Sequence, residues 1–180
     1  MMKIKDVLQS KPDSEFLYEE LIELNEGWSF YTLLKLNSSI LIGWLKNDDL
    51  LIINGNGIFL YDIENKNITM EDYESDFKKY LSADNLKYSL KERNEIVDVF
   101  GLRGGGGNLL TSDNEWKLEI NNIHNNFKIP RLMNYKTRKS CFFKLHGMSY
   151  EGYMYCGFSK TQKYFLIMGD QGINIYKKDF

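Results

Sequence analysis

The stretch of this chain with the clearest capacity for chemistry is an arginine followed by four glycines: Arg103, Gly104, Gly105, Gly106 and Gly107. Glycine-rich backbone can surround a phosphate, because its amide groups approach the oxygens closely. A P-loop, however, needs lysine and then serine or threonine after its glycines, and here an asparagine and two leucines follow. A dinucleotide-binding loop needs a helix at that point, whereas the next segment predicts a turn and a strand.

The glycine run is therefore interpreted as a loop between strands at residues 96–102 and 116–120. Glycine loses more backbone freedom on folding than other residues, so four in a row favour a loop that packs closely on another surface or becomes ordered on a partner. Arg103 would anchor the loop in either case. A small-molecule or nucleotide-phosphate site at Arg103–Gly107, in a binding protein or an enzyme, is the alternative.

The histidines and cysteines form no recognisable metal or nucleophile motif. His124 and His146 are far apart in sequence and have no carboxylates at ligand spacing. A hairpin over residues 141–156 would place Cys141 directly opposite Cys156, close enough for a disulfide under oxidising conditions. We expect two reduced cysteines, and a Cys–His pair that uses His146 is not favoured. The sequence predicts neither a metal nor a cofactor.

The charged residues also give no catalytic pair. Asp98 and Glu119 are acids within apolar runs, and strand alternation predicts that Asp98 points to solvent, away from Val97 and Val99. The basic segment 128–139 could contact nucleic-acid phosphates, yet the sequence pI is about 5.8 and no aromatic platform motif is present. Nucleic-acid binding and acid–base catalysis are therefore not favoured.

Two segments predict helices that carry acidic side chains. Residues 13–27 begin with a capping aspartate or serine, end at a glycine and repeat leucines at helical spacing. Glu19, Glu20 and Glu23 lie on this helix, which contains no lysine or arginine. These glutamates form either a solvated face or a docking surface for a basic partner. Residues 71–83 predict a second, central helix.

Most of the remaining chain predicts short strands in antiparallel meanders. Matched residues, among them Gly57 with Gly172, predict that residues 33–62 and 142–177 are two copies of one four-stranded unit. The two glycines would supply a positive φ at the hairpin reversals. Residues 121–140 predict an irregular connection with at most one strand. The expected strands of the two copies span residues 31–36, 40–45, 50–54, 57–63, 141–146, 152–158, 163–168 and 172–178.

Length and composition indicate one domain that spans residues 1–180. Hydrophobic residues make up 43% and charged residues 27%, as in ordinary folded proteins, and the many aromatic residues favour strands. We expect a cytoplasmic protein, because neither a signal peptide nor an apolar run long enough to cross a membrane is evident. The predicted fold class is α+β: mostly antiparallel β meanders, with an N-terminal and a central helix.

The charge distribution and the lack of a catalytic motif favour a protein that binds another protein. Residues 1–76 contain 15 acidic and 6 basic side chains, a balance of −9, and residues 77–180 contain 10 and 17, a balance of +7, so the whole chain carries −2. This general profile resembles that of bacterial immunity proteins, which neutralise a toxin domain by covering its active site. No motif of that class is present. The resemblance implies a basic toxin domain as partner, which the acidic helix and the Arg103–Gly107 loop would contact.

Overall fold

The computed structural model describes residues 27–36, 39–73, 76–102, 105–124 and 127–179. In this part of the chain 57% of the residues lie in strands and 5% in helices, none of which reaches seven residues. The predicted fold class, α+β, is therefore wrong, and the protein is a β-sheet protein. The predicted N-terminal helix lies outside the described residues, apart from its final glycine. None of the described helices is long and apolar enough to cross a membrane.

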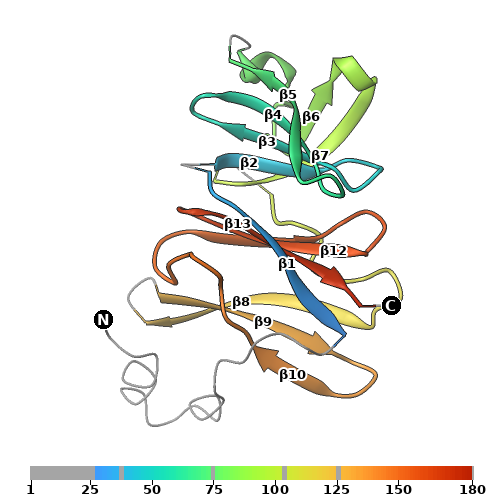
Figure 1. The fold of residues 1–180 in the computed structure, drawn as a ribbon, viewed down its shortest axis with the longest axis vertical. Coiled ribbons are helices and arrows are strands. Elements are labelled where there is room, and N and C mark those ends of the chain that lie inside the picture. Colours follow the sequence, from blue (N-terminus) through green and yellow to red (C-terminus); the bar gives the residue numbers. More distant parts are fainter. Residues whose placement is uncertain (1–26, 37–38, 74–75, 103–104, 125–126, 180) are drawn as a thin grey trace.

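The described strands form three sheets, which are stacked as layers in Figure 1. The six-stranded sheet has the order β5-β4-β3-β2-β7-β6 and is built from β2 (Ser39–Trp44), β3 (Leu50–Asn54), β4 (Gly57–Asp62), β5 (Asn67–Asp72), β6 (Lys87–Leu90) and β7 (Glu95–Gly101). The four-stranded sheet, in the middle of the stack, has the order β1-β13-β12-β11 and is built from β1 (Trp28–Leu34), β11 (Met154–Phe158), β12 (Tyr164–Gly169) and β13 (Gly172–Lys178). The three-stranded sheet has the order β10-β9-β8 and is built from β8 (Trp116–His124), β9 (Phe127–Asn134) and β10 (Lys139–Phe142).

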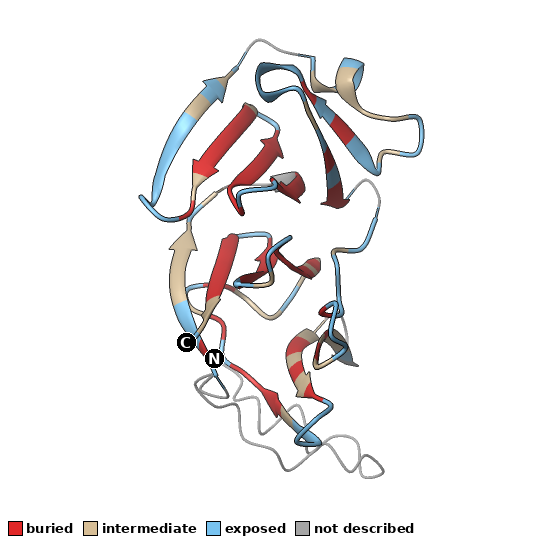
Figure 2. Ribbon diagram, turned by 90° about the vertical axis from the view of Figure 1, so that its right-hand side faces the viewer, coloured by how far each residue is buried: buried red, intermediate tan, exposed pale blue. Residues whose placement is uncertain are grey.

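Both faces of the four-stranded sheet are covered, which explains the sequence of its strands. Leu166 on one face of β12 packs with Ile52 and other residues of the six-stranded sheet. Phe165 on the opposite face packs with Leu118 of the three-stranded sheet. All of β12 is buried, and Figure 2 shows the buried residues gathered within and between the layers. A strand buried on both faces is a continuous apolar run, so this strand was predicted correctly.

The two predicted repeats contain three-stranded meanders with the same pairing register. Gly43 pairs with Leu51 in β2 and β3, and the matched residues Gly157 and Leu166 pair in β11 and β12. That the two segments are copies of one unit stays a prediction.

Gly57 and Gly172 begin the third strand of each meander, and both have the predicted positive φ, +156° and +148°. A Cβ atom on Gly57 would lie 2.2 Å from the carbonyl oxygen of Asp72, and one on Gly172 would lie 2.2 Å from that of Leu34. These carbonyls belong to the neighbouring strands β5 and β1. Glycine therefore lets a fourth strand approach each meander closely.

That fourth strand is not the one predicted from sequence. Residues 31–34 lie in β1, which pairs with β13 rather than with β2. Residues 141–142 lie in β10, which pairs with β9 rather than with β11. The predicted four-stranded units are therefore wrong in their first strand. The apolar pattern locates a strand, but it does not show which strand pairs with its edge or which elements cover its faces.

The central helix predicted over residues 71–83 is also wrong. The first two of these residues end β5, in which Met70 pairs with Leu60 of β4. The segment that follows contains one turn of 3-10 helix, η1 (Phe77–Tyr80). A second short turn, η2 (Lys91–Arg93), joins β6 to β7. For the first two residues of this segment, hydrogen bonds and packing with β4 stabilise a strand more than the local sequence stabilises a helix.

The predicted strands at residues 96–102 and 116–120 are confirmed as β7 and β8. The region between residues 121 and 140, predicted to be an irregular connection, is more regular than expected. It contains the end of β8, the whole of β9 and the start of β10. Its Asn and Lys side chains hid the strand pattern, because this three-stranded sheet has only one face against the core.

Candidate functional site

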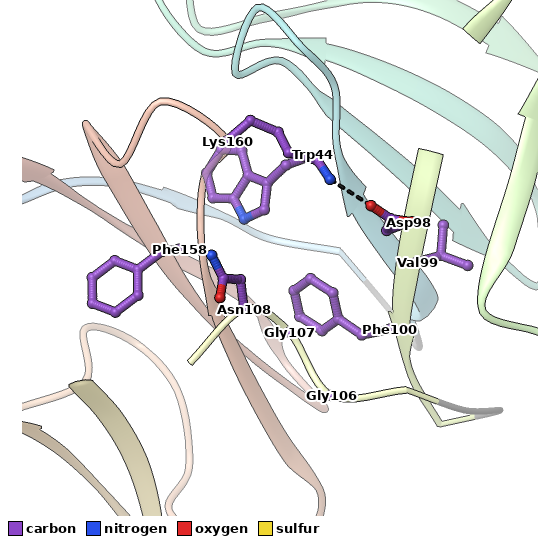
Figure 3. Close-up of a pocket in the computed structure, with 9 residues that line it drawn as sticks. All are labelled: Trp44, Asp98, Val99, Phe100, Gly106, Gly107, Asn108, Phe158 and Lys160. Carbon is purple, nitrogen blue, oxygen red and sulfur yellow. Dashed lines mark hydrogen bonds and ion pairs between the residues drawn. The ribbon is translucent and has the colours of Figure 1, made fainter. Parts of the chain in front are cut away.

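A recess of about 250 Å³ lies where the chain leaves β7 and passes β11 on its way to β8. Figure 3 shows the residues that line it, which come from β2, β7, the end of the glycine run with the residue after it, and the end of β11 with the segment that follows. It is lined by Trp44, Asp98, Val99, Phe100, Gly106, Gly107, Asn108, Phe158 and Lys160. Two of the predicted site residues, Gly106 and Gly107, thus contribute to it.

Three buried aromatic side chains, Trp44, Phe100 and Phe158, line the recess. The indole N–H of Trp44 donates to the carbonyl oxygen of Gly157 over 3.3 Å. This bond fixes the ring and uses the only donor that a tryptophan side chain has. The rings of Trp44 and Phe100 therefore offer a ligand apolar contact, whereas the Phe158 ring points away from them and packs against Trp28 and Phe165.

A charged pair stands beside these aromatic residues. Lys160 and Asp98 form an ion pair, drawn as a dashed line in Figure 3. The distance between the ammonium nitrogen of Lys160 and Oδ2 of Asp98 is 2.5 Å. The two side chains are 47% and 62% exposed, so the pair contributes only about 0–1 kcal/mol to stability. Asp98 points to solvent while Val97 and Val99 are buried, which confirms the alternation predicted for this strand. A polar ligand could separate the two charges at little cost, but they do not form a buried acid–base pair.

Close packing explains two of the glycines in the run. Gly105 has a φ of +68°, and a Cβ there would lie 2.9 Å from the carbonyl oxygen of Val99. A Cβ on Gly107 would lie 2.1 Å from the carbonyl oxygen of Cys156, whereas one on Gly106 would meet nothing within 4 Å. The run therefore packs closely on other backbone, which is one of the two roles expected for it.

The chain continues from Gly107 as an extended segment that links β11 to β8. The Asn108 carbonyl accepts from the Phe158 N–H over 2.7 Å, and the Leu109 carbonyl accepts from the Leu118 N–H over 2.9 Å. No helix begins here, so the run lacks the helix N-terminus that holds phosphate in nucleotide-binding loops.

The other predicted site residues lie outside the described part of the chain. They are Glu19, Glu20, Glu23, Arg103 and Gly104. Their roles stay predictions.

The two cysteines are not opposite each other, contrary to the hairpin predicted over residues 141–156. Cys141 pairs with Leu132 of β9, and Cys156 pairs with Ile167 of β12. Both are buried thiols in the core between the four-stranded and three-stranded sheets. Burial raises the pKa of the Cys156 thiol to about 12, the direction opposite to the one that a nucleophile needs.

The described histidine side chain is a packing residue. The ring of His146 stacks on that of Phe30, with 3.8 Å between the ring centroids. Its backbone N–H donates to Oδ1 of Asn174 over 2.8 Å. Within the residues that the structure describes, no three His, Cys, Asp or Glu side chains come together in a way that could hold a metal ion.

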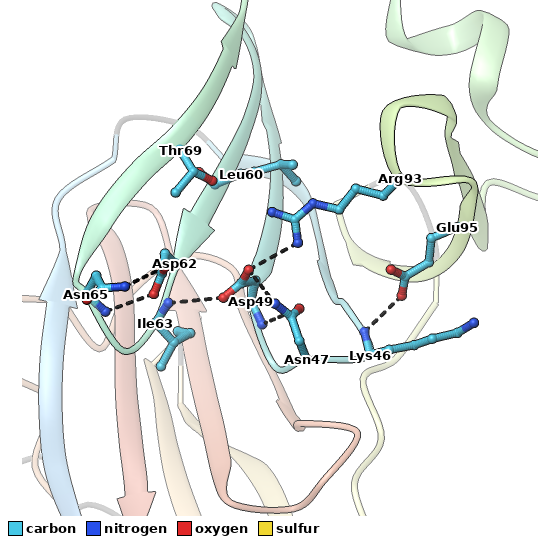
Figure 4. A network of polar contacts seen from close by, with 10 residues as sticks. All are labelled: Lys46, Asn47, Asp49, Leu60, Asp62, Ile63, Asn65, Thr69, Arg93 and Glu95. Atoms are coloured by element: carbon cyan, nitrogen blue, oxygen red, sulfur yellow. Dashed lines mark hydrogen bonds and ion pairs between the residues drawn. The ribbon is translucent and has the colours of Figure 1, made fainter.

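A polar network around Asp49 joins three parts of the six-stranded sheet (Figure 4). Asp49 is 8% exposed and forms an ion pair with Arg93 of η2, with 3.2 Å between Nη1 and Oδ2. Its other oxygen accepts from the Ile63 N–H over 3.4 Å, and the Lys46 N–H donates to Glu95 over 2.9 Å. Because these charges are satisfied by the chain itself, we assign the network to holding the β2–β3 turn in place.

The sequence interpretation missed two charged surfaces on the six-stranded sheet. The described residues between 62 and 76, around β5, include five acidic side chains and one basic side chain, a balance of −4. Residues 77–93, which include η1, β6 and η2, contain five basic and two acidic side chains, a balance of +3. The charge runs were visible in the sequence. The wrong assignment of a helix across their boundary concealed that they belong to different strands of one sheet.

No protein-family model matches the chain, and no curated protein matches it in sequence. Any functional assignment must therefore come from the chemistry of its own surfaces.

Proposed function

We propose that this protein is a non-enzymatic protein-binding module of the immunity type, which neutralises a basic toxin domain by binding to it directly. The observation that carries the proposal is the exposed acidic strand at one edge of the six-stranded sheet. In the described part of the chain, β5 has a neighbouring strand on one side only, β4.

The exposed edge combines apolar and acidic side chains. Ile68 is 41% exposed and Tyr73 is 62% exposed, although large hydrophobic side chains are usually covered. The Tyr73 ring packs edge-on against Phe59, and its hydroxyl donates to Oε2 of Glu71 over 2.5 Å. An aromatic ring held in place beside a carboxylate suits the centre of a protein interface, where aromatic residues contribute most of the binding energy.

The edge can also bind through its backbone. An edge strand presents unpaired N–H and C=O groups, to which a strand of a partner can add. The negative balance of residues 62–76 would attract a basic partner from a distance and raise the association rate. A nuclease toxin domain has the required positive surface, because it must bind nucleic-acid phosphates.

The test begins with capture of a partner by the tagged full-length protein from its native cells, at about 150 mM salt. The captured partner is then purified, and its binding to three forms of the protein is compared: wild type, Glu71→Lys and Glu151→Lys. Both glutamates are exposed, and both variants change the charge equally, but only Glu71 lies on β5. We expect Glu71→Lys to weaken binding about fivefold to tenfold and to reduce its salt dependence, while Glu151→Lys binds like wild type.

Neutralisation is a separate measurement on the same complex. The toxic or enzymatic activity of the partner should fall in proportion to the fraction bound. A partner that stays fully active in the complex would contradict the immunity function, and equal binding by the two glutamate variants would contradict the role of β5. A triple variant with Glu19, Glu20 and Glu23 changed to Lys shows whether the predicted acidic helix contributes as well.

The recess beside Gly106 and Gly107 supports a second candidate function, binding of a small molecule. Its buried aromatic residues and the exposed Asp98–Lys160 pair could hold a small ligand that carries both charged and apolar groups. A thermal-shift screen with nucleotides, sugar phosphates and amino acids tests this function, since a ligand that binds only the folded protein raises its Tm. A ligand found in this way should bind less well to Arg103→Ala if the whole loop is involved. No Tm increase across the screen would argue against the small-molecule function.

A further inference from the structure

A second hollow, of about 440 Å³, lies beside β6 at the opposite end of the strand order from β5. It is formed by η1 and the residues after it, β6, the start of η2 and Ile96 of β7. Three lysines line it, Lys79, Lys87 and Lys91. Ile96 is 68% exposed, the highest value among the large hydrophobic side chains that the structure describes. This combination of an exposed apolar residue and several cations is not explained by the core or by the acidic edge.

Two of the carboxylates near the hollow have hydrogen-bond or ion-pair partners of their own. Oδ1 of Asp84 accepts from the Ser82 hydroxyl over 2.5 Å and from the Leu86 N–H over 3.1 Å. Asp98 forms its ion pair with Lys160, which does not line this hollow. Within the described residues, none of the three lysines forms an ion pair within 4 Å. Residues 77–93, with Asp84 and Glu92 included, carry five basic and two acidic side chains, a balance of +3, so the hollow is positive.

Part of the lining is held firmly. The Tyr80 ring packs edge-on against buried Tyr88, with 6.0 Å between ring centroids. The Lys91 ammonium lies 4.7 Å from the centre of the Tyr80 ring. This contact holds one cation near the hollow, so less side-chain freedom is lost when an anion binds.

We infer that this hollow is a second docking surface, and that its occupant is an acidic protein segment with an apolar side chain placed between carboxylates. The carboxylates would meet Lys79, Lys87 and Lys91, and the apolar side chain would cover Ile96. Exposed apolar surface favours a protein partner, because a nucleic acid would bury phosphates and would need stacking rings or arginines. The described lining has no arginine, and its aromatic ring, Tyr80, already packs against Tyr88 and Lys91.

This inference goes beyond the proposed function, because it concerns another surface, of opposite charge, and does not depend on the partner of β5. One chain could then bind a basic protein at its acidic edge and an acidic segment at its basic hollow. The two surfaces lie on strands at opposite ends of the six-stranded order, while Met70 of β5 and Tyr80 beside the hollow pack in the same core cluster, so it is their opposite charge that distinguishes them.

The test is fluorescence anisotropy of a labelled synthetic peptide in which glutamates flank a central leucine, titrated with the full-length protein. The hollow is altered in two ways, by Lys79→Glu with Lys91→Glu and by Ile96→Ser. The matched controls are Lys35→Glu with Lys163→Glu, two exposed lysines elsewhere, and Leu102→Ser, at an exposed apolar residue that lines neither proposed surface. Circular dichroism and Tm establish that each variant is folded before binding is compared.

We expect the peptide to bind wild type and both controls equally. The lysine variant should bind it about tenfold more weakly and with less salt dependence. The Ile96→Ser variant should lose the preference for the leucine peptide over an all-glutamate peptide. Equal binding by hollow variants and controls, or no binding of the peptide to wild type, would overturn the inference. Tighter binding of a single-stranded oligonucleotide that is insensitive to Ile96→Ser would overturn it in favour of a nucleic-acid surface.

Discussion

The two adjacent glycines Gly106 and Gly107 give the sharpest test of how the glycine run works, because one substitution is crowded and the other is not. In Gly107→Ala the new Cβ would lie 2.1 Å from the carbonyl oxygen of Cys156 and 2.7 Å from Cα of Gly157. In Gly106→Ala it would meet nothing within 4 Å. The chemical change is identical, so a difference between the two variants reports the contact with β11 alone.

The magnitude follows from how firmly the crowded segment is held. A normal non-bonded contact is about 3.5 Å or longer, so the chain at Gly107 must shift by roughly 1 Å or more. Such overpacking costs about 1–3 kcal/mol. The shift also strains the bond between the Phe158 N–H and the Asn108 carbonyl, 2.7 Å, whose loss costs about 1 kcal/mol. We expect Gly107→Ala to lower the free energy of unfolding by about 3 kcal/mol, and Gly106→Ala to change it by less than about 0.5 kcal/mol.

Urea denaturation followed by tryptophan fluorescence measures both free energies, and calorimetry gives the accompanying change in Tm. For a chain of this size, about 3 kcal/mol corresponds to a Tm lowered by roughly 6–12 °C. If Gly107→Ala is as stable as Gly106→Ala, the close approach to β11 is not a feature of the folded protein, and the assignment of the glycine run to packing is refuted. Equal destabilisation by both would instead point to a general need for glycine along the run.

Three further predictions concern buried polar and titratable groups. Asp49→Asn should lower the free energy of unfolding, measured by urea denaturation, by about 1–2 kcal/mol, because it removes one charge from a half-buried ion pair. Most of this effect should disappear when Arg93 is already replaced by Met. Burial raises the pKa of Tyr88 from 10.0 to about 12, so the folded state holds the phenol proton more tightly than the unfolded state does. The resulting contribution to the free energy of unfolding is complete below pH 10 and is lost as the pH rises towards 12. Tyr88→Phe should therefore reduce the loss of stability measured between pH 10 and pH 12. Cys141 and Cys156 should both resist iodoacetamide in the native protein and react after unfolding, and rapid native labelling of Cys156, whose pKa is about 12, would contradict its burial.

Strands with an unambiguous apolar pattern could be located from sequence alone. Residues 50–54 and 163–168 are continuous apolar runs, and the structure places β3 and β12 there because both faces of those strands are covered. Positive φ at Gly57 and Gly172 was likewise predicted from the turn sequence. These features depend on neighbouring residues, so they can be recognised without knowing the rest of the fold.

Only part of the candidate site could be predicted from the sequence. The glycine run indicated a position where the backbone must be free of side chains. The reason is the close approach of Gly107 to the carbonyl oxygen of Cys156, which is distant in sequence. The recess also uses Trp44 and Lys160, which no spacing rule connects to the run. The change from acidic to basic residues at residue 76 is visible in the sequence, whereas the placement of these residues on β5 and β6 depends on the fold.

What the sequence by itself determined is where many strands lie, where the chain turns, and how charge is distributed along it. Only the tertiary structure decided that β1 pairs with β13 and that residues 67–72 form an edge strand. It also decided that the described residues form three core clusters, two of which lie between sheets. The physical reason is that a strand cannot satisfy its hydrogen bonds or bury both faces by itself. Its partners are chosen by packing across long sequence separations, and that choice overrides a local preference for helix in a segment such as residues 71–83.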